Sequence, residues 1–156
     1  GEEHMSKTLA RLIVARRKAQ PFETTTDLAQ LIADAYKSKG KQEKIHPATR
    51  VFQALRIEVN DELGHLRRFL ESLPGLLAPG ARVAIISFHS LEDRIVKQYF
   101  QAESRDCVCP PRLPICQCGH QASFKVLTNK PVSGSDAEIR LNPRARSAKL
   151  RAAVRL

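Results

Sequence analysis

The feature that most constrains the fold is an uninterrupted apolar run, Val83–Ile86, which follows a Pro-Gly turn at residues 79–80. A short apolar run bounded by turn signals is typical of a strand buried on both faces, as in a parallel sheet. Ser90 and Asp93 then form a Ser-x-x-Asp capping pattern, which predicts a helix over about residues 91–101. A strand at 82–88 that leads directly into a helix indicates an α/β protein.

Three amphipathic helices are expected before this strand. Apolar residues recur at helical spacing within residues 5–18, and Pro21 stops that pattern. Residues 24–26, three threonines, offer hydroxyl caps for a second helix, and Pro47 suits the first position of a third. The apolar face of the third helix runs over about six turns and consists of Phe52, Leu55, Val59, Leu63, Leu66 and Leu70.

Two strands are expected near the C-terminus. Residues 124–127 form a short candidate, and the segment 147–155 alternates between two kinds of side chain. The apolar members are Ala148, Leu150, Ala152 and Val154, and the basic ones are Lys149, Arg151 and Arg155. Such alternation predicts a half-exposed strand, and we expect the two strands to pair antiparallel.

Polar residues cluster where the apolar strand ends. Ser87, His89 and Ser90 lie between that strand and the next helix. In open α/β sheets, ligands bind beyond the carboxyl ends of strands and near helix N-termini. These residues are therefore candidates for contact with a substrate. A helix cap with a surface histidine explains the same pattern equally well.

The basic residues suggest a polyanionic partner. The formal net charge is +10 and the isoelectric point is about 9.9, which fits RNA, DNA or acidic lipid. His46 and Arg50 lie four residues apart on a helix face, and the turn at 142–147 is rich in guanidinium groups that match phosphate. We expect one RNA-facing edge to contain the strand-end residues together with His46, Arg50, Arg94, Asn142, Arg144 and Arg146. The alternatives are a solvated first turn and a solubilising loop.

All four cysteines fall in one short stretch, as Cys107, Cys109, Cys116 and Cys118. Four thiolates can hold zinc tetrahedrally, although two intervening residues within a pair are more usual than one. A structural zinc site and a set of free thiols are both compatible with this spacing. Neither a signal peptide nor a membrane-spanning run is recognisable, which predicts a reducing, cytoplasmic setting without a membrane partner.

Several motifs together resemble the RsmH (MraW) family of ribosomal RNA methyltransferases. They are GEEHMSKTLARLIVARR at residues 1–17, HPATRVFQALRIEVNDEL at 46–63, LAPGARVAIISFHSLEDRIVKQYF at 77–100, and LTNKPV followed by NPRARSAKLRAAVR over 127–155. They occur in order over nearly the whole chain, and the combination is highly specific. The resemblance is to the C-terminal half of the family.

The resemblance implies a fold and a division of the chain. The family has a class I, Rossmann-like methyltransferase sheet, with a helical substrate-recognition insert before its fifth strand. Residues 1–45 would then be the end of the insert, and 46–156 the C-terminal part of the methyltransferase domain. The Gly-Gly-His-Ser loop that holds S-adenosylmethionine belongs to the other half, and no such motif occurs here.

The resemblance also implies an activity. Family members transfer a methyl group from S-adenosylmethionine to the N4 amine of a cytidine in small-subunit ribosomal RNA, so the ribosomal RNA or the subunit is the expected partner. This chain alone is then expected to be inactive. A non-catalytic RNA-binding module and a partner domain that completes a sheet are the alternatives.

Overall fold

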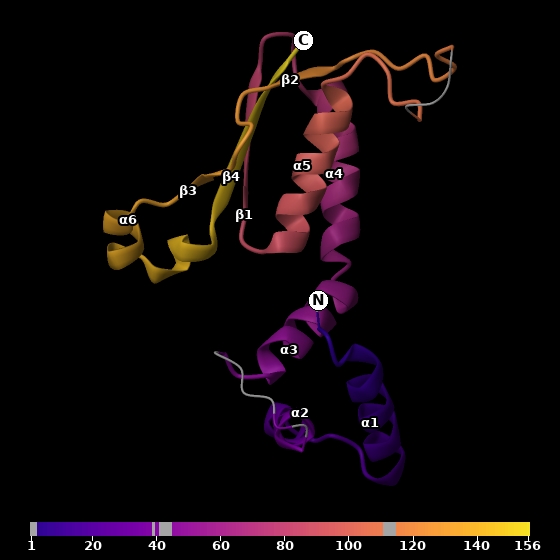
Figure 1. Ribbon diagram of the computed structural model, residues 1–156, viewed down its shortest axis with the longest axis vertical. Helices are drawn as coiled ribbons and strands as arrows, with labels where there is room; N and C mark the ends of the chain where they lie inside the picture. Colours follow the sequence, from indigo (N-terminus) through magenta and orange to yellow (C-terminus); the bar gives the residue numbers. More distant parts are fainter. Residues whose placement is uncertain (1–2, 39, 41–44, 111–114) are drawn as a thin grey trace. The chain divides into compact units, whose positions relative to one another are not determined.

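A computed structural model describes residues 3–38, 40, 45–110 and 115–156 (Figure 1). The chain forms two compact units, Gly1–Glu62 and Leu63–Leu156. The sequence-based division after residue 45 refers to the parts of a larger enzyme fold, and it stays a prediction. No helix among the described residues is long and apolar enough to cross a membrane.

The first unit contains three helices, α1 (Ser6–Ala19), α2 (Thr25–Lys37) and α3 (Ala48–Val59). The Thr24 hydroxyl accepts a hydrogen bond of 3.2 Å from the Asp27 amide, and the Asp27 carboxylate accepts one of 3.0 Å from the Thr24 amide. This capping box confirms the predicted start of α2. The helices share a core made of Met5, Leu9, Ile32, Ala35, Tyr36, Ala48 and Val51.

The prediction of one continuous third helix is wrong. Helix α3 ends at Val59, and α4 (Glu62–Leu76) begins after a break at Asn60 and Asp61. Asp61 has a φ of 46°, in the left-handed region that ends a helix. Asn and Asp enter this region more readily than most residues. The apolar spacing continues across the break, which is why the periodicity gave no sign of it.

The second unit is built on a small antiparallel sheet. Its strands are β1 (Arg82–Ser87), β2 (Phe124–Val126), β3 (Val132–Ser133) and β4 (Lys149–Arg155). The order is β1-β4-β2, with β3 also paired to β4, and every pairing is antiparallel. The mixed α/β class and the antiparallel pairing of the last two predicted strands are confirmed. The short elements β3, α6 (Asp136–Leu141) and η1 (Pro143–Ser147) were not predicted.

Helices α4 and α5 (Ser90–Glu103) lie on one face of this sheet (Figure 1). The core between them consists of Leu70, Leu73, Val96, Phe100, Phe124 and Ala153. The rings of Tyr99, Phe100 and Phe124 pack in tilted pairs with centroids 5.8 to 6.2 Å apart. Burial of this aromatic cluster fixes α5 against β2 and β4.

The opposite face of the sheet is not covered by any described helix of this unit. Ile86 is 55% exposed, and Arg82 and Ala84 on the same face are exposed too. Strand β1 is therefore not buried on both faces in this chain, contrary to the prediction. It also lies at an edge of the sheet rather than in the middle of a parallel one. The apolar run suits a strand that is covered on both faces, but the described residues within 63–156 cover only one face of β1.

Candidate nucleic-acid interface

The predicted strand-end residues and the arginine-rich turn lie at the same end of the sheet. Ser87, the last residue of β1, is paired with Lys149, the first residue of β4. Because η1 directly precedes β4, it lies beside the turn from β1 into α5 (Figure 1). Two motifs about 60 residues apart in sequence thus meet at one edge.

Ser87 has a structural role. It is only 4% exposed, and its hydroxyl donates a hydrogen bond of 3.3 Å to the carbonyl oxygen of Lys149. The serine therefore fastens the end of β1 to β4 and does not face solvent. Ser90, by contrast, is exposed in the first turn of α5.

His89, and not Ser90, caps helix α5. Its Nδ1 accepts a hydrogen bond of 3.3 Å from the Glu92 amide, and the Glu92 carboxylate accepts bonds from the amides of His89 and Phe88. The predicted Ser90–Asp93 cap is therefore wrong by one residue. Histidine is not among the usual capping residues, so the pattern in the sequence favoured the serine.

The second ring nitrogen of His89 lies beside the Glu92 carboxylate. Nε2 is buried and makes no hydrogen bond to any described residue, although Glu92 Oε1 lies 3.4 Å away. Because Nδ1 accepts a hydrogen bond, the neutral ring carries its proton on Nε2. His89 therefore holds a buried Nε2–H donor beside the Glu92 carboxylate at the end of the sheet.

A buried ion pair between β4 and α5, close to this end of the sheet, was not predicted. Arg151 on β4 donates hydrogen bonds of 2.7 and 3.1 Å to Asp93 on α5, and Lys149 Nζ lies 3.7 Å from the same carboxylate. The hydrogen bonds from Arg151 hold the pKa of Asp93 below its ordinary value, against the opposing effect of burial. The pair joins the N-terminus of α5 to the sheet.

The structure shows which side of β4 faces the helices, a point that the alternation in the sequence left open. Arg151 is only 6% exposed, and Arg155 donates a hydrogen bond of 2.8 Å to the Ser123 carbonyl and lies over the Phe124 ring. The basic side of the strand thus faces the helices. Its apolar side, with Leu150, Ala152 and Val154, shares the uncovered face with Ala84 and Ile86.

The arginine-rich turn is a single 3-10 helix, η1. The Asn142 side chain caps it by accepting a hydrogen bond of 3.2 Å from the Arg144 amide, and Ala145 anchors it with 6% exposure. Arg144 and Arg146 are exposed. Asn142 therefore shapes the turn, while the two guanidinium groups are accessible to a ligand.

His46 and Arg50 belong to the first unit. His46 is exposed and its Nδ1 accepts a hydrogen bond of 3.2 Å from the Ala48 amide, so it caps the start of α3. Arg50 is half-buried on α3, and Arg94 is exposed on α5 in the second unit. The convergence of both sets on one RNA-facing edge stays a prediction.

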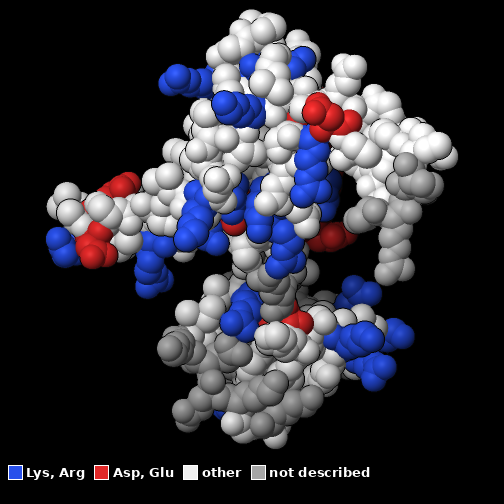
Figure 2. Space-filling view, turned by 45° about the horizontal axis from the view of Figure 1, so that its top comes forward, with Lys and Arg blue, Asp and Glu red and all other residues white. Residues whose placement is uncertain are grey.

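Further basic groups surround a hollow between α5 and the sheet, which sequence reasoning missed. Its volume is about 170 Å³, and its polar lining comes from Lys97, Gln101, Ser104, Arg105, Thr128, Asn129 and Arg151. Lys and Arg side chains also predominate over acidic ones on the face seen in Figure 2. Lys97 and Arg105 lie eight residues apart on and after one helix, and no strand-end motif pointed to them.

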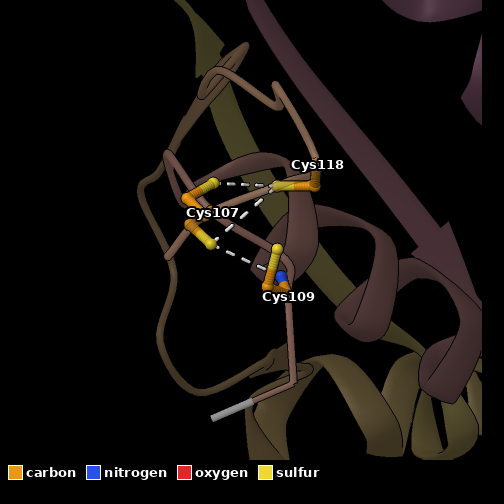
Figure 3. Close-up of side chains that lie close together, drawn as sticks. Cys107, Cys109 and Cys118 are labelled. Atoms are coloured by element: carbon orange, nitrogen blue, oxygen red, sulfur yellow. Dashed lines mark hydrogen bonds between the residues drawn. The ribbon is translucent and has the colours of Figure 1, made fainter. Parts of the chain in front are cut away.

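The four cysteines come together in the segment between α5 and β2. All four are free thiols, and their sulfur atoms lie within 4.8 Å of one another. Figure 3 shows the sulfur atoms of Cys107, Cys109 and Cys118 turned toward a common centre. The backbone amides of His120 and Val108 lower the pKa of the Cys118 thiol to about 6. The four sulfur atoms thus lie close enough together to bind one ion, as predicted. That they bind a metal stays a prediction.

The sequence is similar to a known family over its whole length. The family model described as "MraW methylase family" matches residues 1–156. Similar curated relatives carry the name Ribosomal RNA small subunit methyltransferase H. That of Heliobacterium modesticaldum is 54% identical over 156 residues, which are 100% of this chain and 50% of the relative.

Two further relatives of the same name show the same relation. The protein of Nitratidesulfovibrio vulgaris is 55% identical over 157 residues, with 100% of this chain and 44% of the relative covered. That of Thermomicrobium roseum is 54% identical over 156 residues, with 100% and 47% covered. The chain therefore spans about half the length of the curated relatives it matches.

Proposed function

Because this chain belongs to the MraW methylase family, we propose that it is the RNA-facing half of a methyltransferase acting on small-subunit ribosomal RNA. The reaction is transfer of a methyl group from S-adenosylmethionine to the N4 amine of a cytidine. The match of all 156 residues to proteins named Ribosomal RNA small subunit methyltransferase H carries this proposal. Since the chain spans about half of those relatives, the activity is that of the longer enzyme.

Two hollows of the second unit do not suit S-adenosylmethionine. A ribose diol is typically held by a carboxylate, and no described acidic residue lines the hollow beside α5 or the neighbouring one beside the cysteine segment. The first hollow instead contains Lys97, Arg105 and Arg151, which disfavour a cationic sulfonium. We therefore assign the cofactor to the remaining half of the enzyme.

The uncovered face of the sheet supports an enzyme in two halves. Ala84, Ile86, Leu150, Ala152 and Val154 form a continuous apolar surface, and β1 has an unpaired edge among the described strands. Exposed apolar strands at a sheet edge pair readily with another segment. The remaining half of the methyltransferase sheet packs here in our proposal.

His89 is the group that we place closest to the target base. The N4 amine is a poor nucleophile because its lone pair is delocalised into the ring, so catalysis depends on accurate placement of the base. The Nε2–H of His89 is buried and makes no hydrogen bond within the described residues, and it can donate to a cytosine ring acceptor that displaces Glu92 from this position. Because the neutral ring has its hydrogen on Nε2, His89 is a positioning donor and not the acceptor of the amine hydrogen.

Arg144 and Arg146 bind the RNA backbone in this proposal. Both are exposed on η1 at the same end of the sheet as His89. Guanidinium groups bind phosphate with bidentate geometry, and such contacts fix the register of the nucleic acid without reading its sequence. The capped, rigid turn reduces the entropy lost when the two arginines bind.

The direct test uses the full-length enzyme and purified small ribosomal subunits. Labelled methyl from S-adenosylmethionine should enter the RNA, and digestion should release N4-methylcytidine. Label recovered in protein, in another nucleoside or nowhere would contradict the proposal.

A further inference from the structure

We propose that Cys107, Cys109, Cys116 and Cys118 bind one Zn²⁺ ion as four thiolates. The two Cys-x-Cys pairs come from separate stretches of the segment between α5 and β2. The four sulfur atoms nevertheless all lie within 4.8 Å of one another. Soft thiolate ligands in a set of four favour zinc over the hard cations that prefer oxygen.

The distances between sulfur atoms agree with a tetrahedral site. With a Zn–S bond near 2.3 Å, the sulfur atoms of a regular tetrahedron lie about 3.8 Å apart. The separation between Cys118 and Cys107 is 3.8 Å, and that between Cys116 and Cys118 is 3.5 Å (Figure 3). Thiols at these distances need little movement to enclose an ion.

Backbone amides donate hydrogen bonds to two sulfur atoms of the cluster. The Cys109 amide donates a 3.4 Å hydrogen bond to Cys107 Sγ, and the Gln117 amide donates one of 3.4 Å to Cys109 Sγ. The second bond crosses from one cysteine pair to the other. Amide donors of this kind orient ligands and spread thiolate charge, as outer-shell groups do around metals.

Hydrophobic burial does not explain why the thiols meet. Val108 is 47% exposed and Ile115 is 72% exposed, so the described part of this segment has no apolar core of its own. A hydrogen bond from the Ala122 amide to Asp106 joins the two ends of the segment, and one from the Ser123 amide to the Glu103 carbonyl ties it to α5. A bound cation supplies the missing stabilisation, and the thiols release their protons to solvent as it binds.

The ion would shape a surface beside α5. Val108, Cys109 and Pro110 form one side of a hollow of about 450 Å³ whose other side is α5 and the residues that follow it. Gln101 and Arg105 line both this hollow and the basic one described above. A zinc-held segment therefore fixes one wall of a groove continuous with basic side chains.

The test measures metal in the full-length protein, purified in reducing buffer without a metal-affinity tag. Elemental analysis should find about one more zinc ion for each chain in the native protein than in the double variant Cys107→Ser, Cys118→Ser. Replacement by Co²⁺ should give the visible absorption of tetrahedral thiolate coordination. A metal-free protein whose four thiols all react freely, or one that contains two disulfides, would overturn the proposal.

A matched variant distinguishes the four-thiolate set from a histidine-containing one. His120 lies two residues after Cys118, and its buried Nε2 has no hydrogen-bond partner among the described residues. His120→Ala should retain the zinc, and loss of the ion in this variant would contradict the proposed ligand set. Circular dichroism should show the same helix content in all variants, which excludes general unfolding as the cause of metal loss.

Protease protection gives a readout independent of metal analysis. Chelation should speed cleavage between residues 104 and 123 by about tenfold, because the segment opens more often once no bound ion stabilises its closed form. The double serine variant should be cleaved at the fast rate with or without chelator. Equal cleavage of the native protein before and after chelation would show that no ion orders this segment.

Discussion

Arg151 on β4 and Asp93 on α5 form a bidentate ion pair, with hydrogen bonds of 2.7 and 3.1 Å, behind the proposed RNA-facing edge. Their side chains are 8% and 12% exposed. Loss of one partner from such a pair leaves an uncompensated charge in a poorly hydrated place. The pair thus fixes the start of α5, and with it His89, relative to the sheet.

Substitution Asp93→Asn should destabilise the second unit by about 3–5 kcal/mol, because Arg151 stays buried without its counter-charge. Denaturant unfolding of the full-length protein measures this change. The double variant Asp93→Leu, Arg151→Met should recover most of the loss, since it removes both charges. A cost below about 1 kcal/mol for the single variant would mean that the pair is effectively solvated.

The same pair predicts an acid-labile fold. Arg151 holds the folded pKa of Asp93 below its ordinary value of 3.8. The stabilisation is therefore fully present above the unfolded pKa and is lost as the pH falls through the lower folded pKa. The free-energy difference between the native protein and Asp93→Asn should be constant above about pH 5 and should shrink as the pH falls below the unfolded pKa of 3.8. A difference that does not change with pH would contradict this linkage.

His89 caps α5 through Nδ1 and carries a hydrogen-bond donor at Nε2, and two variants distinguish these roles. His89→Ala should lose about 1 kcal/mol of stability with the cap, whereas His89→Asn should keep it, because asparagine is a good N-cap. Both variants should lose methyl transfer by the full-length enzyme, since neither retains the Nε2 donor. Full activity in His89→Asn would show that the histidine is only a cap.

Charge reversal of Arg144 and Arg146 should weaken RNA binding and flatten its dependence on salt. Each lost phosphate contact lowers the slope of log K against log salt by about 0.7 to 0.9. The matched control, Arg144→Lys with Arg146→Lys, keeps the charge and should keep most of the slope. Affinity and slope that do not change in the reversed variant would refute the phosphate role.

Local chemistry made much of the fold predictable. The capping box at Thr24 and Asp27, the strand start after the Pro-Gly turn, and the last strand all depend on neighbouring residues. Asp61 shows the limit, because an apolar period that continues across a break is indistinguishable from one helix. The burial of β1 was overpredicted because an apolar sequence shows that a strand suits a covered position, but it does not show which segments cover it. Among the described residues, one face of β1 is exposed and the strand lies at the edge of the sheet.

The site was less predictable because its contacts are long-range. Arg151 meets Asp93 across 58 positions of sequence, and alternation in β4 could not tell which side of the strand faces the helices. The strand-end position of His89 was visible in the sequence, but its capping role was assigned to Ser90. The proximity of the four cysteines was visible as a short spacing, since 12 residues hold all of them.

The central claim is that this chain supplies RNA contacts while the rest of the enzyme holds the methyl donor. Calorimetric titration with S-adenosylmethionine tests it most directly, with the full-length enzyme as the positive control. The full-length enzyme should bind saturably, and this 156-residue chain should give no binding heat and no methyl transfer. Saturable binding by this chain alone, with a dissociation constant of about 1–10 μM, would contradict the assignment of the cofactor site.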